Sequence, residues 1–517
     1  MGKAVRILVD GASIQAEEGQ SLTSALMMAG IPAVRKSPEG EARGALCAMG
    51  TCYECRATVN GVRGVRTCLV AVEDGMRIER EEKLKPSSLS LSSMKDSADR
   101  NETVETNLVV IGAGPAGLAA ACAAAELGLD VIVIDESMGP GGRIWSHRHD
   151  PPLAARNWLE RAREAGVRRL QGYTVYQGQP GILQVARITD GRRLEVRCQK
   201  IVVATGARER FLPFPGWTLP GVVGAGALQS LIKGGLQLKK RRVLVAGTGP
   251  LLLAVARVAR QSGAEVILAE QSSMVQRTSL AIPLLLSPSR WKPALQLWQS
   301  LRGIDQYSSS WVREARGDHS VREVVLRTPS GDQVLSVDGL AVGYGLIPES
   351  RVAAGLGCEL EESGTVRVDA LQQTSVEGVL CAGEPTGVSG CEAALDEGLV
   401  AGIVAAGRNP RARLLARVRR HRFWGQALES AHPLRDEVLQ LAGDREILCR
   451  CEDVRIGELS QVTSVREARL IHRVGMGPCQ GRVCESSPIC QALSGSDTIR
   501  PPWAVVPGEN TNREKQI

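Results

Sequence analysis

The stretch Asn107-Leu-Val-Val-Ile-Gly112-Ala-Gly114-Pro-Ala-Gly117 is the most informative part of this chain of 517 residues. Its apolar first half predicts a buried parallel strand, and an alanine-rich segment with helical pattern follows the glycines. Gly112 permits a tight turn, Gly114 lets a pyrophosphate approach the backbone, and Gly117 lets helix and strand pack closely. The phosphates then lie at the helix N-terminus. The stretch therefore predicts an α/β chain built on Rossmann-like dinucleotide-binding domains.

A carboxylate follows the next strand, as this motif requires. Val131–Ile134 is apolar and leads into Asp135, about 20 residues beyond the glycines. A carboxylate at this place accepts hydrogen bonds from a ribose 2′-hydroxyl, and Glu136 is the close alternative. Pro115 and Ala116 complete the phosphate-binding turn. The motif contains, in order, a strand, the glycines, a helix, a second strand and an acid. This order favours a nucleotide site over a Rossmann unit that serves packing alone.

A second Rossmann unit begins at Arg242. It carries Gly247 and Gly249, and Glu270 occupies the ribose position. The third glycine is replaced by Leu252, whose side chain is expected to push helix and strand apart and to alter the phosphate site. Glu270 would repel a 2′-phosphate, which argues against NADP. Three interpretations remain open for this unit: it binds NAD, it binds another adenine nucleotide such as ATP, or it binds no nucleotide.

Four cysteines near the N-terminus have the spacing C-x4-C-x2-C-x12-C, which is that of a plant-type [2Fe–2S] cluster: Cys47, Cys52, Cys55 and Cys68. Gly50 lets the backbone of the first loop approach the cluster, so that its amides point at the sulfurs. Val5–Gly11 is expected to be a strand and turn, and Ser21–Gly30 a short helix, as in a β-grasp ferredoxin. The alternatives are a zinc site or buried thiols, but zinc sites usually show paired C-x2–4-C units.

A second cysteine set lies near the C-terminus. A C-x-C pair is followed by a turn at Gly475–Pro478 and a C-x4-C pair, which gives the candidate ligands Cys449, Cys451, Cys479 and Cys484. This set predicts a second [2Fe–2S] cluster, and four-thiolate zinc is the competing interpretation. Cys490 is left as a spare thiol.

Composition narrows the class of protein. The net charge of +7 is modest and aromatic residues make up 3% of the chain, which argues against nucleic-acid binding. Cysteines grouped in ligand-like sets, with no visible signal peptide, indicate a reducing cytoplasm. The apolar run 108–134 is interrupted by glycines and acids and predicts no membrane span. The arginines of 406–447 indicate a solvated helix face, or else a surface for an acidic partner or for the inner face of the membrane.

Two further segments resemble motifs of flavoproteins that have two dinucleotide domains. Val202–Ala207 resembles their ATG segment, and Leu380–Glu384 resembles their second FAD motif, in which Asp is the usual acid. The resemblance implies FAD at the first site, with further contacts from Gly142, Arg143, Ala204, Thr205, Gly206, Gly383, Glu384 and Ala393. No redox-active cysteine pair follows the first glycine motif, which excludes a disulfide-reductase mechanism.

These motifs divide the chain into successive domains. We expect a ferredoxin-like domain at 1–80, a linker at 81–105, and an FAD-binding domain in two segments, 106–235 and 346–405. A second nucleotide-binding domain is expected at 236–345, between these two segments. A basic helical connector at 406–447, a small helical iron–sulfur domain at 448–500 and a tail at 501–517 complete the chain as given.

This domain order resembles a fusion of the smaller subunits of hydrogen cyanide synthase, and is similar to subunits of opine oxidases and of heteromeric D-hydroxyproline or proline dehydrogenases. The segments Cys47–Leu69, Gly112–Gly117 and Gly475–Cys484 carry the resemblance. The last of these resembles the bacterioferritin-associated-ferredoxin-like [2Fe–2S] domain. In that family a separate subunit resembling D-amino-acid oxidase oxidises a C–N bond.

The resemblance implies an FAD and iron–sulfur electron-transfer subunit of a hetero-oligomeric amino- or imino-acid dehydrogenase, of opine, D-amino-acid, hydroxyproline or glycine type. The sequence offers no convincing acid–base pair, so catalytic residues are not assigned. One alternative is a self-sufficient NADH-dependent reductase that passes electrons to its own clusters. Another is an iron–sulfur scaffold or sensor without enzymatic activity.

Overall fold

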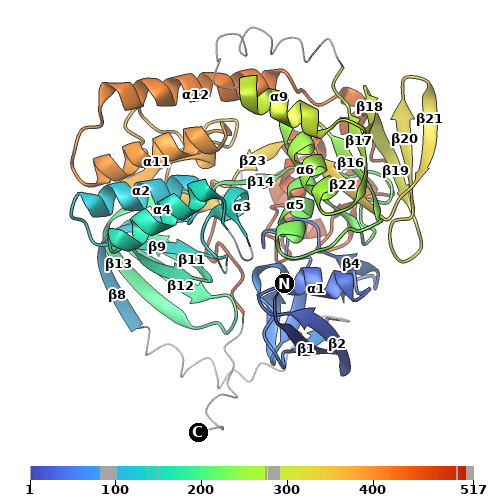
Figure 1. Cartoon of the computed structure of the whole chain (residues 1–517), viewed down its shortest axis with the longest axis horizontal. Helices are drawn as coiled ribbons and strands as arrows, with labels where there is room; N and C mark the ends of the chain where they lie inside the picture. Colours follow the sequence, from blue (N-terminus) through green and yellow to red (C-terminus); the bar gives the residue numbers. More distant parts are fainter. Residues whose placement is uncertain are drawn as a thin grey trace.

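The computed structural model describes residues 2–81, 102–137, 139–147, 151–273, 276, 291–495 and 499–507. Most of the expected linker, 82–101, and the end of the tail, 508–517, lie outside the described residues. In Figure 1 the first Rossmann unit lies at the left and the second at the right, with the N-terminal module below the second.

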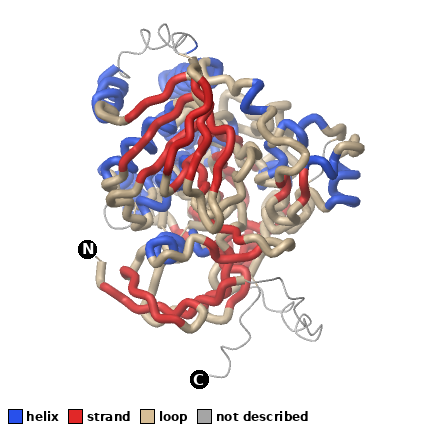
Figure 2. The backbone as a smooth tube through the Cα atoms, turned by 90° about the vertical axis from the view of Figure 1, so that its right-hand side faces the viewer, coloured by secondary structure: helices blue, strands red, loops and turns tan. Residues whose placement is uncertain are grey.

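The N-terminal module is a five-stranded sheet in the order β2-β1-β7-β5-β6, with a helix over it. Its first strand alternates buried and more exposed side chains, so Val5, Ile7 and Val9 enter the core. The N-terminal sheet forms the lower part of Figure 2. The elements are β1 (Ala4–Val9), β2 (Ala12–Glu17), α1 (Leu22–Met28), β3 (Ala33–Lys36), β4 (Ala42–Gly44), β5 (Arg56–Val59), β6 (Val62–Arg66), η1 (Thr67–Leu69) and β7 (Arg77–Arg80).

The first Rossmann unit is a seven-stranded sheet in the order β10-β9-β8-β13-β12-β11, and β24 joins it by pairing with β13. Its first strand starts at Glu102, so the last residues of the expected linker belong to the sheet. The elements are β8 (Glu102–Ile111), α2 (Pro115–Glu126), β9 (Val131–Asp135), α3 (Gly142–Trp145), α4 (Leu153–Glu164), β10 (Arg168–Gln171), β11 (Tyr173–Gln179), β12 (Ile182–Arg187), β13 (Arg193–Val203), α10 (Arg351–Gly355), β24 (Val379–Cys381), η4 (Glu384–Thr386) and α11 (Cys391–Ala405).

The second Rossmann unit is a parallel sheet in the order β15-β22-β16-β17-β18. It begins earlier than expected, because β15 and α5 belong to it rather than to the first unit. A three-stranded sheet and a short ribbon are attached to it. The elements are β14 (Ala207–Glu209), β15 (Val222–Gly224), α5 (Ala225–Lys233), β16 (Arg242–Gly247), α6 (Pro250–Gln261), β17 (Glu265–Glu270), α9 (Trp291–Ser300), β18 (Asp305–Ser308), β19 (Trp311–Arg316), β20 (Glu323–Thr328), β21 (Gly331–Ser336), β22 (Gly339–Gly343) and β23 (Leu346–Pro348).

A long helix, α12, crosses the top of the molecule and leads into a small C-terminal module (Figure 1). The described part of the expected tail is packed: Trp503 is fully buried, and its amide donates to the carbonyl of Tyr176 at 2.6 Å. The elements are α12 (Ala412–Ser430), α13 (Asp436–Leu439), β25 (Ile447–Cys449), β26 (Val454–Arg455), η5 (Ile456–Leu459), α14 (Val465–His472), η6 (Cys484–Ser486) and α15 (Pro488–Ala492).

Candidate redox sites

The glycine loop of the first Rossmann unit sits between β8 and α2, at the carboxyl ends of the strands. A β-carbon on Gly117 would lie 1.8 Å from the carbonyl oxygen of Gly112, and one on Gly112 would lie 2.3 Å from the carbonyl oxygen of Ala204. Both positions therefore exclude a side chain, as the motif predicts. Gly142 lies against Gly114 across the same loop. The predicted segments around 112–117, 142 and 204 are thus brought together at one place.

The two candidate ribose acids have different surroundings. Asp135 accepts hydrogen bonds from the amides of Ala113 at 2.6 Å and Ser137 at 2.7 Å, and burial raises its pKa despite these donors. Glu136 is paired with Arg66 of the N-terminal module at 2.9 Å, and this cation lowers its pKa against the effect of burial. Asp135 thus lies at the phosphate loop, whereas Glu136 is engaged by another module.

The second flavin motif folds back onto the first helix. A β-carbon on Gly383 would lie 2.8 Å from that of Ala116, and Ala393 is buried in the first turn of α11. Burial raises the pKa of Glu384, which lies beside the Thr205–Ala207 loop and receives a hydrogen bond from the amide of Ala207. Burial of this carboxyl fits a group that meets a cofactor better than one that meets solvent.

A buried acid that the sequence motifs did not single out holds this segment in place. Glu397 accepts hydrogen bonds from the Gly383 amide and the Thr386 hydroxyl, both at 2.8 Å, and pairs with Arg422 at 2.8 Å. Arg417 of α12 pairs with Asp396 of α11 as well. Two arginines of the basic connector are therefore structural partners of α11, while others of that stretch are exposed: Arg408, Arg411, Arg413, Arg419 and Arg420.

The first cysteine set consists of three buried cysteines and the half-buried Cys68, and its thiols pair in the way a two-iron cluster requires. The thiol of Cys47 contacts that of Cys52, and the thiol of Cys55 contacts that of Cys68. The amides of Met49 and Cys52 point at the Cys47 sulfur, each at 3.4 Å. Burial opposes ionisation of Cys47, but the hydrogen bonds it receives outweigh burial and lower its pKa to about 5. Thiolates stabilised by amides are the ligands that such a cluster uses.

The second cysteine set has the same pairwise arrangement. The thiol of Cys451 contacts that of Cys479, and the thiol of Cys449 contacts that of Cys484. The hydrogen bond from Cys451 lowers the pKa of Cys479 to about 7, although burial opposes this. Cys490 lies against Cys484 rather than apart from the set.

The pairing bears on the choice between iron–sulfur and zinc. Within the part of the chain that the structure describes, no three His, Cys, Asp or Glu side chains are placed to hold a single metal ion. Zinc needs four ligands converging on one point, whereas each iron of a [2Fe–2S] cluster takes two protein thiolates. The pairwise thiol contacts of both sets fit the two protein thiolates that each iron of a [2Fe–2S] cluster takes.

Arg143, expected at the flavin site, reaches the loop of the first cysteine set. Its guanidinium donates to the carbonyl oxygens of Ala48 at 3.2 Å and Met49 at 2.6 Å. Arg66 donates to the carbonyl of Gly50 at 3.0 Å, in addition to its pair with Glu136. The cysteine loop is thereby fixed to the first nucleotide site by two arginines, of which the sequence motifs singled out only Arg143.

The second nucleotide site is folded but covered. The carboxylate of Glu270 accepts from the amides of Gly249 at 2.9 Å and Ser272 at 3.0 Å. A β-carbon on Gly249 would lie 4.0 Å from the ring of His432, which belongs to the connector after α12. The side chain of Gln271 donates to the carbonyl of Pro433 at 3.2 Å. The connector therefore lies over the phosphate loop and the ribose edge of this unit.

Leu252, at the position of the third glycine, is accommodated beside a glycine of the sheet. The side chain is fully buried, and its end would lie 2.9 Å from a β-carbon on Gly343. Because Gly343 on β22 has no side chain, the sheet itself provides the room for the leucine. The sequence analysis did not identify this glycine, which lies on another strand.

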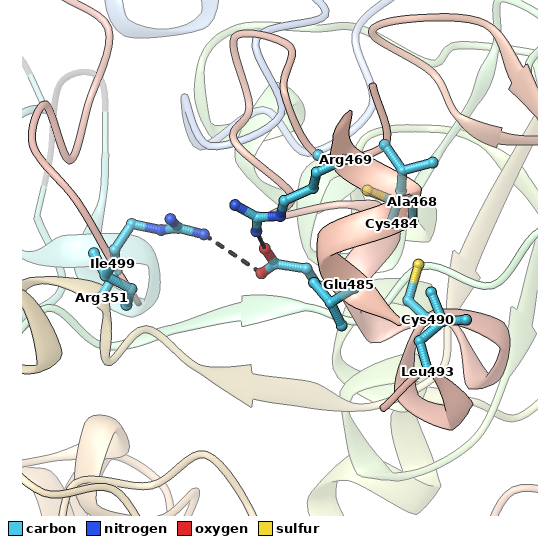
Figure 3. A pocket seen from close by; sticks show the side chains of 11 residues that line it. Arg351, Ala468, Arg469, Cys484, Glu485, Cys490, Leu493 and Ile499 are labelled. Carbon is cyan, nitrogen blue, oxygen red and sulfur yellow. Dashed lines mark hydrogen bonds and ion pairs between the residues drawn. The ribbon is translucent and has the colours of Figure 1, made fainter. Parts of the chain in front are cut away.

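A cavity of about 290 Å³ lies beside the second cysteine set. Figure 3 shows the carboxylate of Glu485 between Arg351 and Arg469, with Cys484 and Cys490 on the same side of the cavity. Glu485 lies 3.0 Å from Arg469 and 3.4 Å from Arg351. The thiol of a candidate cluster ligand thus borders a cavity whose lining is mainly apolar and whose charged groups are Glu485 and its two arginine partners.

The fold and these sites define an oxidoreductase with a flavin-type nucleotide domain and an iron–sulfur module. The family model described as pyridine nucleotide-disulphide oxidoreductase matches residues 106–398, and one described as 2Fe-2S iron-sulfur cluster binding domain matches residues 2–83. The chain belongs to the pyridine nucleotide-disulphide oxidoreductase family. No helix in the described part of the chain is long and apolar enough to cross a membrane.

Relatives extend over most of the chain. An opine oxidase subunit from Rhizobium meliloti is 33% identical over 441 residues, which cover 76% of this chain and 95% of that protein. The hydrogen cyanide synthase subunit HcnB of Pseudomonas aeruginosa is 30% identical over 425 residues, which cover 73% of this chain and 90% of that protein. L-proline dehydrogenase from P. horikoshii has the same fold, with a TM-score of 0.70 at 20% identity, covering 100% of this chain and 98% of that one. The resemblance stated from the motifs is confirmed, as are the fold class and the oxidoreductase assignment.

Proposed function

We propose that this chain is the FAD and iron–sulfur electron-transfer subunit of a hetero-oligomeric enzyme that oxidises the C–N bond of an amino or imino acid. Substrate oxidation takes place on a partner flavoprotein resembling D-amino-acid oxidase. The bound cofactors are FAD at Gly112–Gly117 and two [2Fe–2S] clusters. The two cysteine sets require reducing surroundings, which supports a cytoplasmic location for the chain.

The observation that carries the proposal is the contact between Arg143 and the first cysteine loop. FAD can exchange electrons in pairs and iron–sulfur clusters exchange them singly, so a chain holding both can divide an electron pair into single electrons. Arg143 and Arg66 hold the cysteine loop against the glycine loop and Glu136. Residues at this junction bind and orient, and none of them is required to act as an acid or base on a substrate.

The covered second nucleotide site favours delivery of electrons by a protein over delivery by NADH. His432 lies against Gly249, and Gln271 is bonded to Pro433. A nicotinamide dinucleotide would need the phosphate loop and Glu270 free. The opine oxidase and hydrogen cyanide synthase relatives are matched over most of their own length, and both are named as subunits. This supports an assembly of the present chain with a partner.

An anaerobic titration of the purified, cofactor-loaded chain with NADH tests the proposal, with flavin and iron–sulfur absorbance as the signal. We expect no bleaching with NADH and full bleaching with dithionite. Rapid bleaching by NADH would overturn the proposal in favour of the self-sufficient reductase. Iron and sulfide analysis of the same sample tests the number of clusters, and co-purification with an amine-oxidising flavoprotein tests the partner.

A further inference from the structure

A buried ion pair connects the two cysteine sets directly. Glu54 lies in the first cysteine loop, between Cys52 and Cys55, and Arg450 lies between Cys449 and Cys451. The carboxylate and the guanidinium are 3.3 Å apart, and their side chains are 0% and 2% exposed. The two loops are almost 400 residues apart in sequence, so the pair is a contact between modules.

Three further charged side chains surround this pair. Arg35 donates to Glu54 at 2.8 Å and to the carbonyl oxygen of Arg450 at 3.2 Å. Arg43 pairs with Asp453 across the same junction at 2.9 Å, and both are buried. We call these five residues the junction network: Arg35, Arg43, Glu54, Arg450 and Asp453.

The junction network contains one more cation than anions. Arg43 also pairs with Glu41 at 2.7 Å, but that side chain is 51% exposed, so solvent screens its charge. The Nε atoms of Arg35, Arg43 and Arg450 are buried and have no hydrogen-bond partner among the described residues. Burying an uncompensated charge is costly, so such a group normally faces an anion. A [2Fe–2S] cluster with four thiolates carries a net negative charge, which grows when the cluster is reduced. The buried cations of the junction network therefore suit the negative charge that the two cysteine sets are built to hold.

Both sets also share one apolar environment. Cys47, Cys52 and Cys479 belong to the same buried hydrophobic core, and Cys451 packs against it. In such surroundings solvent does not screen a charge, so a charge placed between the sets acts on both.

We propose that the junction network, through Glu54 and Arg450, couples the two clusters: it fixes the cysteine loops against each other for direct electron exchange and sets both reduction potentials jointly. The inference rests on the part of the proposed function that assigns a cluster to each cysteine set. Glu54 and Arg450 are positioning residues, since neither is a cluster ligand.

The test is a redox titration of the full, cofactor-loaded chain followed by electron paramagnetic resonance, with the two signals assigned by Cys55→Ser and Cys484→Ser variants. Glu54→Gln removes a negative charge and should raise both potentials. Arg450→Gln removes a positive charge and should lower both. Glu54→Asp keeps the charge and should leave both close to those of the native chain.

Arg455→Gln is the matched control, because Arg455 pairs with Glu39 across the same junction but both side chains are exposed, at 41% and 50%. It should move neither potential. A shift confined to the cluster on the mutated loop would overturn the proposal, since the charge would then act locally.

The native chain gives a readout that needs no substitution. When both clusters are reduced, their unpaired electrons should broaden each other's signals relative to the half-reduced sample. Signals that simply add would overturn direct exchange between the clusters. Iron content separates the two levels of inference: iron for one cluster contradicts the proposed function, whereas iron for two clusters with independent potentials contradicts only the coupling.

Discussion

Arg143 donates a hydrogen bond to the carbonyl oxygen of Met49 at 2.6 Å and thereby joins the short helix α3 to the first cysteine loop. The contact connects two modules through residues that lie 94 positions apart in sequence. Hydrogen bonds to a charged donor contribute roughly 1.5–3 kcal/mol, so the loss of this side chain should loosen the junction.

We predict that Arg143→Gln slows electron exchange between the flavin and the first cluster by at least about tenfold, equivalent to about 1.4 kcal/mol. Stopped-flow absorbance after mixing with limiting dithionite measures the two chromophores separately. Arg161→Gln is the control, because Arg161 forms an exposed pair with Glu126 on the same unit. Equal rates in both variants would show that the Arg143 contact does not govern the exchange.

The connector over the second nucleotide site leads to a second prediction. His432→Gly combined with Arg435→Ala removes the ring facing Gly249 and a side chain that stacks on Trp311. Once the phosphate loop is uncovered, affinity for NADH should rise by at least about tenfold over the native chain, a change of about 1.4 kcal/mol. Fluorescence titration of bound NADH measures it. Tight binding by the native chain would mean that the connector does not block the site.

The glycine loop of the first nucleotide site and the two cysteine sets could be predicted from the sequence, because their residues lie in short motifs with fixed spacing. Gly112–Gly117 and the cysteine spacings predicted a turn and two ligand sets, and the structure brings each group together. Asp135 and Glu136 could not be separated from the sequence. Their roles depend on Arg66, which the motifs leave unmarked.

The long-range parts could not be predicted for a physical reason. A charged residue such as Glu54 or Arg450 is normally placed at the surface, and only the fold reveals that each is the other's buried partner. The strand β15 is short and apolar, and its place in the second sheet depends on pairing with β22, more than a hundred residues later. Leu252 likewise looked unfavourable until Gly343 was placed beside it.

The contact between α2 and α11 gives a third prediction. A β-carbon on Gly398 would lie 2.1 Å from the carbonyl oxygen of Ala116, so the two helices approach backbone to backbone just behind the phosphate loop. Gly398→Ala should destabilise the chain by about 1–3 kcal/mol through overpacking and reduce the FAD content of the purified protein. Thermal unfolding and flavin absorbance measure both effects.

Gly339→Ala serves as the control for that substitution, because the nearest atom to a β-carbon there is 3.9 Å away. It should keep normal FAD content. If Gly398→Ala retained flavin and stability as well as this control, close packing of the two helices would not be required for the site.

The fourth prediction concerns pH and rests on Glu209 of β14, whose buried carboxylate lies at the N-terminus of α5. Burial raises the pKa of this carboxyl to about 8, although hydrogen bonds from the amides of Gly226 and Ala227 oppose the rise. The Cys47 thiolate raises the pKa further and Arg143 lowers it. In the unfolded chain the group has its ordinary value of 4.5.

The sign of the effect follows from proton binding. Between pH 4.5 and about 8 the folded protein retains a proton on Glu209 that the unfolded chain has lost. The folded state binds more protons in this window, so the free energy of unfolding falls as the pH rises through it, and this contribution is lost above about 8. Glu209→Gln removes the titrating group. The melting temperature of this variant should therefore fall less steeply with rising pH across the window than the melting temperature of the native chain. Glu164→Gln, at an exposed glutamate, corrects for the loss of one negative charge. Parallel melting curves for the native chain and Glu209→Gln across this range would mean that Glu209 is ionised in the folded protein.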